Sequence, residues 1–318
     1  MSTQSSEKKS VLDQYQKITV IGAGAIGLSW TALFLANGLK VTVNDPRADL
    51  VEATLKGIEE ISPTLSALGY NVKDLVKNLS FETDLNKAIK DADIIQENGP
   101  ENVAFKQNLY VQIEANLKPG ALVLSSSSGI PATIFSEKMK DGSRVLIGHP
   151  FNPPHLIPLV EIVPGKRTSR EAIEKAKEFY SAIGKNPIVI EQEIPGFVAN
   201  RLQAALFRES INLVNKGVVT MEELDQIVSN SIGLRWAAAG PFKTFTLGGG
   251  TGGFPHFIKH FSSPLEAMWK DLGHPQFDKD TTELLLEQSN NSYGKIPYEQ
   301  LAKVRDEQQL AILHALGK

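Results

Sequence analysis

The sequence predicts an α/β fold with a doubly wound, mostly parallel sheet, followed by an all-helical C-terminal domain. Between about residues 17 and 190, short β-branched runs alternate with helical stretches, the pattern of a parallel sheet covered by helices on both faces. After Pro195 the strand signals stop and long amphipathic segments follow. The 318 residues amount to about two domains at roughly 150 residues per domain. We therefore expect an α/β domain over residues 1–193 and a helical domain over residues 194–318.

Seven short apolar runs predict the strands of the first domain. In chain order they read KITVIG, GLKVTVND, ADIIQE, GALVLSSS, SRVLIGH, LVEIV and NPIVIE. Two helix starts carry the capping-box pattern, a threonine followed three residues later by a glutamate, at Thr168 with Glu171 and at Thr220 with Glu223. The second of these opens one helix of the C-terminal domain. The other helices expected there are FVANRLQAALFRESINLV, TTELLLEQ and YEQLAKVRDEQQLAILHAL.

Composition excludes several classes of function. Lys and Arg total 33 against 36 for Asp and Glu, so the chain lacks the basic excess typical of nucleic-acid binding. With no cysteine, disulfides, thiolate nucleophiles and Cys-ligated zinc are excluded. No apolar run approaches the roughly 18 residues that span a bilayer, and the polar opening segment is unlike a signal peptide. We expect a cytoplasmic protein that binds neither nucleic acid nor membrane.

A glycine motif predicts a dinucleotide site. Gly22, Gly24 and Gly27 form G-x-G-x-x-G between an apolar run and an amphipathic helix. In a Rossmann domain the first glycine makes a tight turn, the second lets the backbone approach a pyrophosphate and the third lets the helix pack on the strand. The amides of Ala25 and Ile26, in the first turn of that helix, would then face the anion.

Asp45 predicts the choice of cofactor. It ends the next strand, 18 residues beyond Gly27, where a carboxylate accepts hydrogen bonds from the ribose hydroxyls and repels a 2′-phosphate. Arg47 could instead serve a 2′-phosphate, but we favour a solvated arginine at a helix start. The sequence therefore predicts NAD as the cofactor.

A histidine and a glutamate suggest the chemistry. His149 ends a predicted strand, and Glu161 lies 12 residues on in an otherwise apolar run. Open α/β sheets bind ligands at the carboxyl ends of their strands. An imidazole there can take a hydroxyl proton when a carboxylate fixes its tautomer. The pair predicts a dehydrogenase.

The motifs VIGAGAIG, SSSSG, GHPFNPP, LVEIV and IPGFVANRL resemble the L-3-hydroxyacyl-CoA dehydrogenase superfamily from about Ile18 to Phe261. The resemblance implies that His149 is the general base and Glu161 its partner. It further implies that Ser128, with a register open by one or two positions along the serine run, and Asn200 hold the substrate oxygen and the nicotinamide carboxamide.

The resemblance extends to a second pair and to assembly. Glu101 and Lys106, in PENVAFK, match residues that line the cofactor. The family also implies a homodimer. Apolar residues in the segment from Phe197 to Val214 are spread over more than one helix face, as expected of a helix buried on several sides.

The substrate is the most open question. The segment SIGLRWAAAGPF differs from the acyl-CoA enzymes and looks more like the branch that contains L-carnitine dehydrogenase and lambda-crystallin, which has L-gulonate 3-dehydrogenase activity. That branch implies a small hydroxy acid, whose carboxylate Arg235 would bind. A short-chain L-3-hydroxyacyl-CoA remains the alternative, and a non-enzymatic NAD-binding or crystallin-like protein is a second alternative.

Two further features have plainer interpretations. His256 and His260 stand four residues apart, but no third ligand completes a shell, so we expect no metal. The glycines of 248–253 follow no strand, which argues against a phosphate loop and favours a loop near the pocket.

Overall fold

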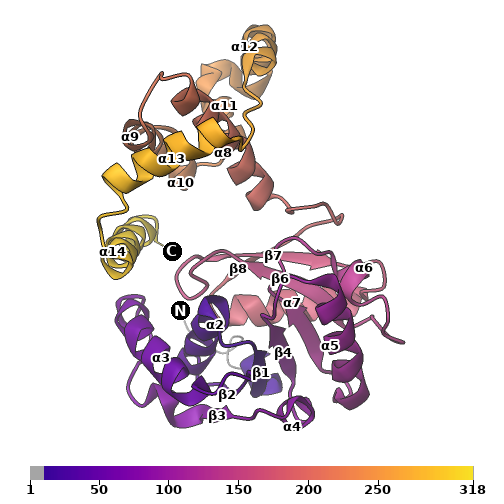
Figure 1. Ribbon diagram of the computed structural model, residues 1–318. Helices are drawn as coiled ribbons and strands as arrows, with labels where there is room; N and C mark the ends of the chain where they lie inside the picture. The colour runs from indigo at the N-terminus through magenta and orange to yellow at the C-terminus, as the bar shows by residue number, and fades with distance from the viewer. Residues whose placement is uncertain (1–10, 318) are drawn as a thin grey trace. The chain divides into compact units, whose positions relative to one another are not determined.

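The computed structural model describes residues 11–317, so the polar opening segment lies outside the described residues (Figure 1). Contacts divide the chain into two compact units with the boundary between Val198 and Ala199. The boundary expected from the sequence lay five residues earlier. The first unit holds the α/β domain and the second is helical.

The α/β unit contains an eight-stranded sheet in the order β3-β2-β1-β4-β5-β6-β7-β8, with β6 and β7 antiparallel and every other neighbouring pair parallel. All seven predicted strands are present. The short strand β3 was not predicted, because its three residues carry no alternating pattern. The strands are β1 Lys17–Ile21, β2 Lys40–Asn44, β3 Leu79–Phe81, β4 Ile94–Glu97, β5 Leu122–Ser125, β6 Val145–Pro150, β7 Leu159–Pro164 and β8 Asn186–Val189.

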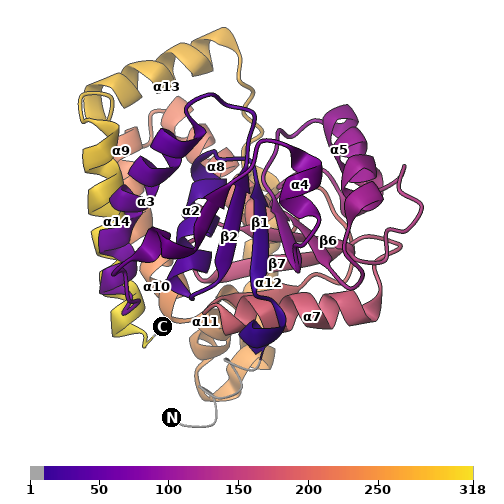
Figure 2. The same ribbon diagram turned by 90° about the horizontal axis from the view of Figure 1, so that it is seen from below.

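Helices cover both faces of the sheet, and side chains alternate between two apolar cores. Ile18 and Val20 face a core shared with α2, α3 and α7, whereas Ile21 faces a core shared with α4, α5 and α6. Figure 2 shows α2 and α3 on one side of the strands and α4 and α5 on the other. The helices are α2 Ala25–Ala36, α3 Leu50–Ala67, α4 Leu85–Ile89, α5 Val103–Asn116, α6 Ala132–Phe135 and α7 Arg170–Ala182, with a 3₁₀ turn η1 at Leu75–Asn78.

The helical unit buries few side chains by itself. Its elements are α8 Ala199–Asn215, α9 Met221–Asn230, α10 Ile232–Ala238, α11 Pro241–Gly248, η2 Gly250–Gly252, α12 Gly253–Asp271, α13 Lys279–Ser292 and α14 Tyr298–Ala315. Within the described residues α8 buries only Ile211, Asn212 and Val214, and α9, α10 and α14 bury none. Large apolar side chains stand exposed instead, such as Phe242 at 75% and Leu247 at 69%.

Only one of the two expected capping boxes forms. The hydroxyl of Thr220 accepts from the amide of Glu223, whose carboxylate accepts from the amide of Thr220. At α7 the cap is Ser169, which accepts from the amide of Ala172, so the expectation for Thr168 with Glu171 is wrong. The hydroxyl of Thr168 donates to the carbonyl of Val145, in the strand behind it.

None of the helices between residues 11 and 317 combines the length and the apolar character that a bilayer crossing requires.

Candidate active site

The glycine loop between β1 and α2 has the shape that a dinucleotide requires. Gly22 has φ +90°, and a Cβ there would lie 2.8 Å from the carbonyl oxygen of Asn98. A Cβ at Gly27 would lie 1.9 Å from the carbonyl oxygen of Gly22. At Gly24, by contrast, a Cβ would meet nothing within 4 Å, and the residue is exposed. The loop is thus tight on the protein side and open where a pyrophosphate would approach.

Helix α2 presents its first turn to that opening. Gly24 is its N-cap and supplies no side-chain cap, and Ala25 and Ile26 follow it. The first amides of an α-helix have no partner within the helix, so they are available to an anion together with the positive end of the helix dipole. These residues fit the diphosphate of NAD.

Asp45 lies just after β2, beside this loop. Its Oδ2 accepts from the amide of Ala23 at 2.8 Å, and its Oδ1 accepts from the amide of Arg47 at 2.9 Å. The guanidinium of Arg47 is bound to Asp49 through two bonds of 2.7 and 2.8 Å, and the hydrogen bond lowers the pKa of Asp49 below its usual value. Arg47 is therefore engaged by its own carboxylate partner.

His149 and Glu161 form a buried pair at the carboxyl edge of the sheet. They are paired residues of β6 and β7, and His149 Nδ1 lies 2.9 Å from Glu161 Oε2. Their exposed fractions are 5% and 2%. Because an ionised carboxylate only accepts, Nδ1 carries the proton and Nε2 is left as the basic nitrogen.

Two phenylalanine rings and one amide surround the pair. The rings of Phe151 and Phe197 each meet the imidazole edge-on at 5.3 Å between centroids. The amide of Val198 donates to Glu161 Oε1 at 3.0 Å. No sequence pattern indicated these contacts, since the residues lie in a loop and at the domain junction.

Ser128 is the last of four consecutive serines that begin at the end of β5. Its side chain is exposed, and within the described residues its hydroxyl makes no hydrogen bond. The three serines before it each donate their hydroxyl to a neighbouring side chain. These bonds run from Ser125 to Glu97 at 2.6 Å, from Ser126 to Asn98 at 2.7 Å and from Ser127 to Glu101 at 2.7 Å. Ser128 is therefore the serine available to a ligand.

Glu101 fastens the serine turn. Its Oε1 accepts from the amides of Gly129 and Ile130, at 2.8 and 3.0 Å, in addition to the hydroxyl of Ser127. Partial burial acts to raise the pKa of Glu101, but these hydrogen bonds and nearby Lys106 hold the pKa below its usual value.

Lys106 lies beneath the surface that Glu101 reaches. Its Nζ is 2.8 Å from both carboxylate oxygens of Glu97 and 3.8 Å from Glu101 Oε2. Lys106 is 1% exposed, so it supports the turn from inside and does not itself line an open surface. Sequence reasoning missed Glu97, because its contact with Lys106 joins two different elements, β4 and α5, and no local pattern indicates it.

Asn200 and Arg235 belong to the helical unit, separately from the histidine–glutamate pair. Asn200 is half-buried in the first turn of α8. Arg235 lies in α10, exposed, and within residues 11–317 its guanidinium makes no hydrogen bond or ion pair. No contact in the described part of the chain therefore supports a capping or ion-pairing role for Arg235.

The structure also places the histidine pair and the glycine cluster noted in the sequence. The rings of His256 and His260 lie next to each other on α12, with centroids 4.2 Å apart and planes tilted by 42°. No group of three or more His, Asp or Glu side chains in the described part of the chain is placed to hold a metal. The glycines of 248–253 form the end of α11, the turn η2 and the start of α12.

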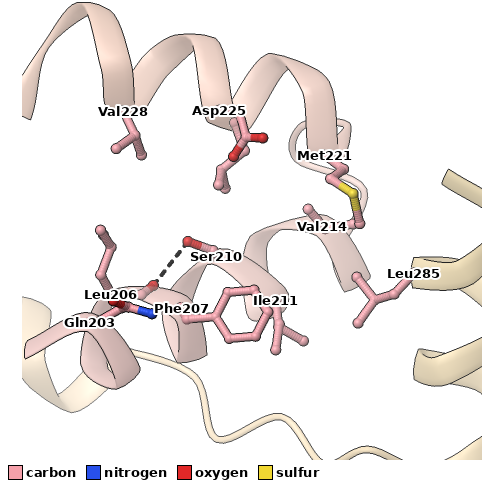
Figure 3. Close-up of a pocket in the computed structure, with 11 residues that line it drawn as sticks. Gln203, Leu206, Phe207, Ser210, Ile211, Val214, Met221, Asp225, Val228 and Leu285 are labelled. Carbon is pink, nitrogen blue, oxygen red and sulfur yellow. Dashed lines mark hydrogen bonds between the residues drawn. The ribbon is translucent and has the colours of Figure 1, made fainter. Parts of the chain in front are cut away.

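The helical unit also contains an apolar groove of about 370 Å³ between α8 and α9, closed at one end by Leu285 of α13 (Figure 3). Side chains from both helices point into it, among them Leu206, Phe207 and Val228. The polar side chains of the lining are Gln203, Ser210 and Asp225; the hydroxyl of Ser210 donates to the carbonyl of Leu206, and the carboxylate of Asp225 accepts from the hydroxyl of Tyr293.

A dinucleotide loop and a buried histidine–glutamate pair on one sheet edge define an NAD-dependent dehydrogenase. Residues 17–194 match the NAD-binding domain of 3-hydroxyacyl-CoA dehydrogenase, and residues 196–281 match the C-terminal domain of the same family. The chain belongs to the 3-hydroxyacyl-CoA dehydrogenase family.

Relatives within this family differ in their named substrates. The chain is 42% identical over 311 residues to a 3-hydroxyacyl-CoA dehydrogenase of Gibberella moniliformis, and 38% identical over 306 residues to an L-carnitine dehydrogenase of Streptomyces coelicolor, covering 96% of both chains in each case. A crystal structure of 5-formyl-3-hydroxy-2-methylpyridine 4-carboxylic acid 5-dehydrogenase, an NAD+ dependent dismutase, superposes with a TM-score of 0.82 at 27% identity, over 95% of this chain and 99% of that one. The protein is an enzyme, which excludes the alternative of a non-enzymatic NAD-binding or crystallin-like protein.

Proposed function

We propose that the enzyme oxidises the 3-hydroxyl of a small L-3-hydroxy acid, of the carnitine or gulonate kind, to the 3-keto acid. The observation that carries this is the buried bond between His149 and Glu161 at the carboxyl edge of the sheet. Bound NAD, held by the glycine loop and Asp45, supplies the acceptor for the hydride that leaves the substrate carbon.

His149 acts as the general base. Its Nε2 takes the hydroxyl proton while the C–H bond breaks, and Glu161 stabilises the imidazolium that forms. A positioned base of this kind contributes about 10²–10⁴ in rate. Burial of the pair keeps water away from the carboxylate, so its charge acts on the imidazole in a low dielectric.

Ser128 and Asn200 hold the substrate oxygen and the nicotinamide carboxamide. Support for Ser128 comes from its exposed hydroxyl at the end of a turn that Glu101 fastens. A fixed turn places a hydroxyl at a defined point without the entropic cost of ordering a loop at each turnover.

An unesterified acid is the favoured substrate class. The L-carnitine dehydrogenase relatives act on a free hydroxy acid, and the exposed Arg235 offers a guanidinium whose fork matches a carboxylate. The 3-hydroxyacyl-CoA relative, at 42% identity, supports the alternative of a thioester substrate.

A substrate panel tests the proposal. NADH absorbance is followed with L-carnitine, L-gulonate, L-3-hydroxybutyrate and L-3-hydroxybutyryl-CoA, each beside its D-enantiomer. The proposal expects the highest kcat/KM with a free L-acid. Activity with the thioester alone would move the enzyme to the acyl-CoA branch, and activity with none would refute the reaction class.

We further propose that the enzyme is a cytoplasmic homodimer joined through its helical unit. Support comes from large apolar side chains that are exposed in the helical unit, such as Leu202, Phe242 and Trp269, since exposed apolar surface marks interaction sites. A second copy of the same unit would cover it symmetrically. Light scattering at micromolar concentration should give twice the chain mass, and a monomeric mass would refute the dimer.

A further inference from the structure

The last turn of the α/β unit adopts an unusual backbone. Gly196 has φ +74° and Phe197 has φ +50°, and the ring of Phe197 is fully buried. A bulky non-glycine residue rarely adopts a left-handed conformation, which persists only where the surroundings impose it. Burial alone does not require this conformation, because a core phenylalanine can be buried from an ordinary backbone.

This turn contacts both members of the catalytic pair. The ring of Phe197 meets the imidazole of His149 edge-on, at 5.3 Å and 63°. The next amide, that of Val198, donates to Glu161 Oε1 at 3.0 Å. One backbone turn thus supplies a wall for the imidazole and a hydrogen-bond donor for the carboxylate.

The second contact fixes the carboxylate plane. Glu161 Oε2 faces His149 Nδ1, and Oε1 faces the Val198 amide, so rotation of the carboxylate would break both bonds. The direction of the Val198 amide depends on the backbone angles of Phe197. An ordinary extended conformation at Phe197 would turn that amide away from Glu161.

We propose that Phe197 is a positioning residue for the histidine–glutamate pair, acting through its left-handed backbone as well as its ring. The proposal rests on the proposed function of that pair. A glycine would adopt the conformation without strain but would give His149 no wall. An aromatic ring on an ordinary backbone would give the wall without the amide.

Replacement of Phe197 by leucine or by isoleucine distinguishes the effect of the backbone conformation from the effect of apolar side-chain volume. Both side chains have the same atoms, but isoleucine is branched at Cβ and tolerates the left-handed region poorly. Phe197→Leu should therefore keep the Val198 amide on Glu161, and Phe197→Ile should lose it. We expect kcat to be about tenfold lower in the isoleucine variant than in the leucine variant, as for a misplaced catalytic group, with KM and NAD affinity alike.

A double-mutant cycle shows whether the effect passes through Glu161. In a Glu161→Gln background the leucine and isoleucine variants should turn over within about twofold of each other, because a glutamine whose oxygen accepts from Nδ1 has no second oxygen for the Val198 amide. A difference that persists unchanged in this background would overturn the proposal, as would equal kcat values in the wild-type background.

Gly196→Ala provides a second probe should the isoleucine variant fail to fold. This change opposes the same turn while every core side chain stays in place, and we expect it to lower kcat with unchanged NAD affinity. A folded alanine variant with wild-type kcat would overturn the proposal. If instead Glu161→Gln and His149→Asn both keep wild-type turnover, the proposed function itself fails.

Discussion

His149 and Glu161 are direct partners across the antiparallel strands β6 and β7, with Nδ1 2.9 Å from Oε2. This register explains their 12-residue spacing in the sequence, because the chain leaves β6, loops over residues 151–158 and returns in β7. The single antiparallel pairing of the sheet thus places a carboxylate beside the base. A parallel neighbour would have needed a crossover helix between the two residues.

Glu161→Gln should reduce turnover less than replacement of His149 does. The glutamine oxygen can still accept from Nδ1, so the tautomer is retained, but the charge that stabilises the imidazolium and the bond from the Val198 amide are lost. Single-turnover rates of both variants, with folding checked by circular dichroism, make the comparison. An equal or larger loss in a folded glutamine variant would assign Glu161 another task.

Asp45→Ser should shift the cofactor preference from NAD toward NADP. The variant loses ribose hydrogen bonds to a charged group, which weakens NAD about tenfold or more, and it removes the repulsion of a 2′-phosphate. Asp45→Asn is the closest control, since its one oxygen can keep the bond from the Ala23 amide, while the charge and the bond from the Arg47 amide are lost. The dissociation constants of NAD and NADP, measured for the wild type and both variants, test this prediction. A wild type that already prefers NADP would show the assignment to be wrong.

Arg235→Met should discriminate a free acid from its methyl ester. A charge-assisted bond to a carboxylate contributes about 1.5–3 kcal/mol, so kcat/KM for the acid should fall roughly tenfold or more while that for the ester changes little. Arg235→Lys serves as the control that keeps the charge but loses the fork. Equal losses for acid and ester would make the arginine structural.

Lys185 should make stability depend on pH. It lies before β8, and its Nζ donates to the carbonyls of Pro154 and Ile157, in the loop after His149. Burial lowers its pKa to about 7 from an ordinary 10.5. Between these values the unfolded chain binds the extra proton, so the free energy of unfolding rises with pH, by up to about 1.4 kcal/mol per pH unit.

Lys185→Met isolates this contribution because its side chain does not titrate. Urea unfolding of both proteins at pH 7, 8 and 9 should show the wild type gaining stability relative to the methionine variant as pH rises. A difference that stays constant over this range would contradict the assignment.

The fold was largely predictable from the sequence because its signals are local. The glycine loop and the alternation of buried strands depend on short stretches, and Gly22 does adopt the left-handed turn that its place in the motif requires. The capping box at Thr220 is present. At α7 the N-cap is Ser169 and not Thr168, because the hydroxyl of Thr168 donates to the carbonyl of Val145.

The supporting contacts of the candidate site were not predictable from local pattern. Glu97 reaches Lys106 from a different element, and Phe197 reaches His149 from the domain junction. Such contacts depend on how strands and loops pack, and no periodicity in the sequence predicts them. The same holds for β3, whose three residues pair with β2 without an alternating pattern.

The central claim is that His149 removes the substrate's hydroxyl proton, and His149→Asn tests it most directly. Asparagine keeps a polar side chain at the site but cannot accept the proton at neutral pH. Under single-turnover conditions, with NAD affinity measured in parallel, we expect that affinity to stay nearly unchanged and the rate to fall by roughly 10²–10⁴. A variant that keeps more than about a tenth of the wild-type rate would contradict the role of His149 as the base.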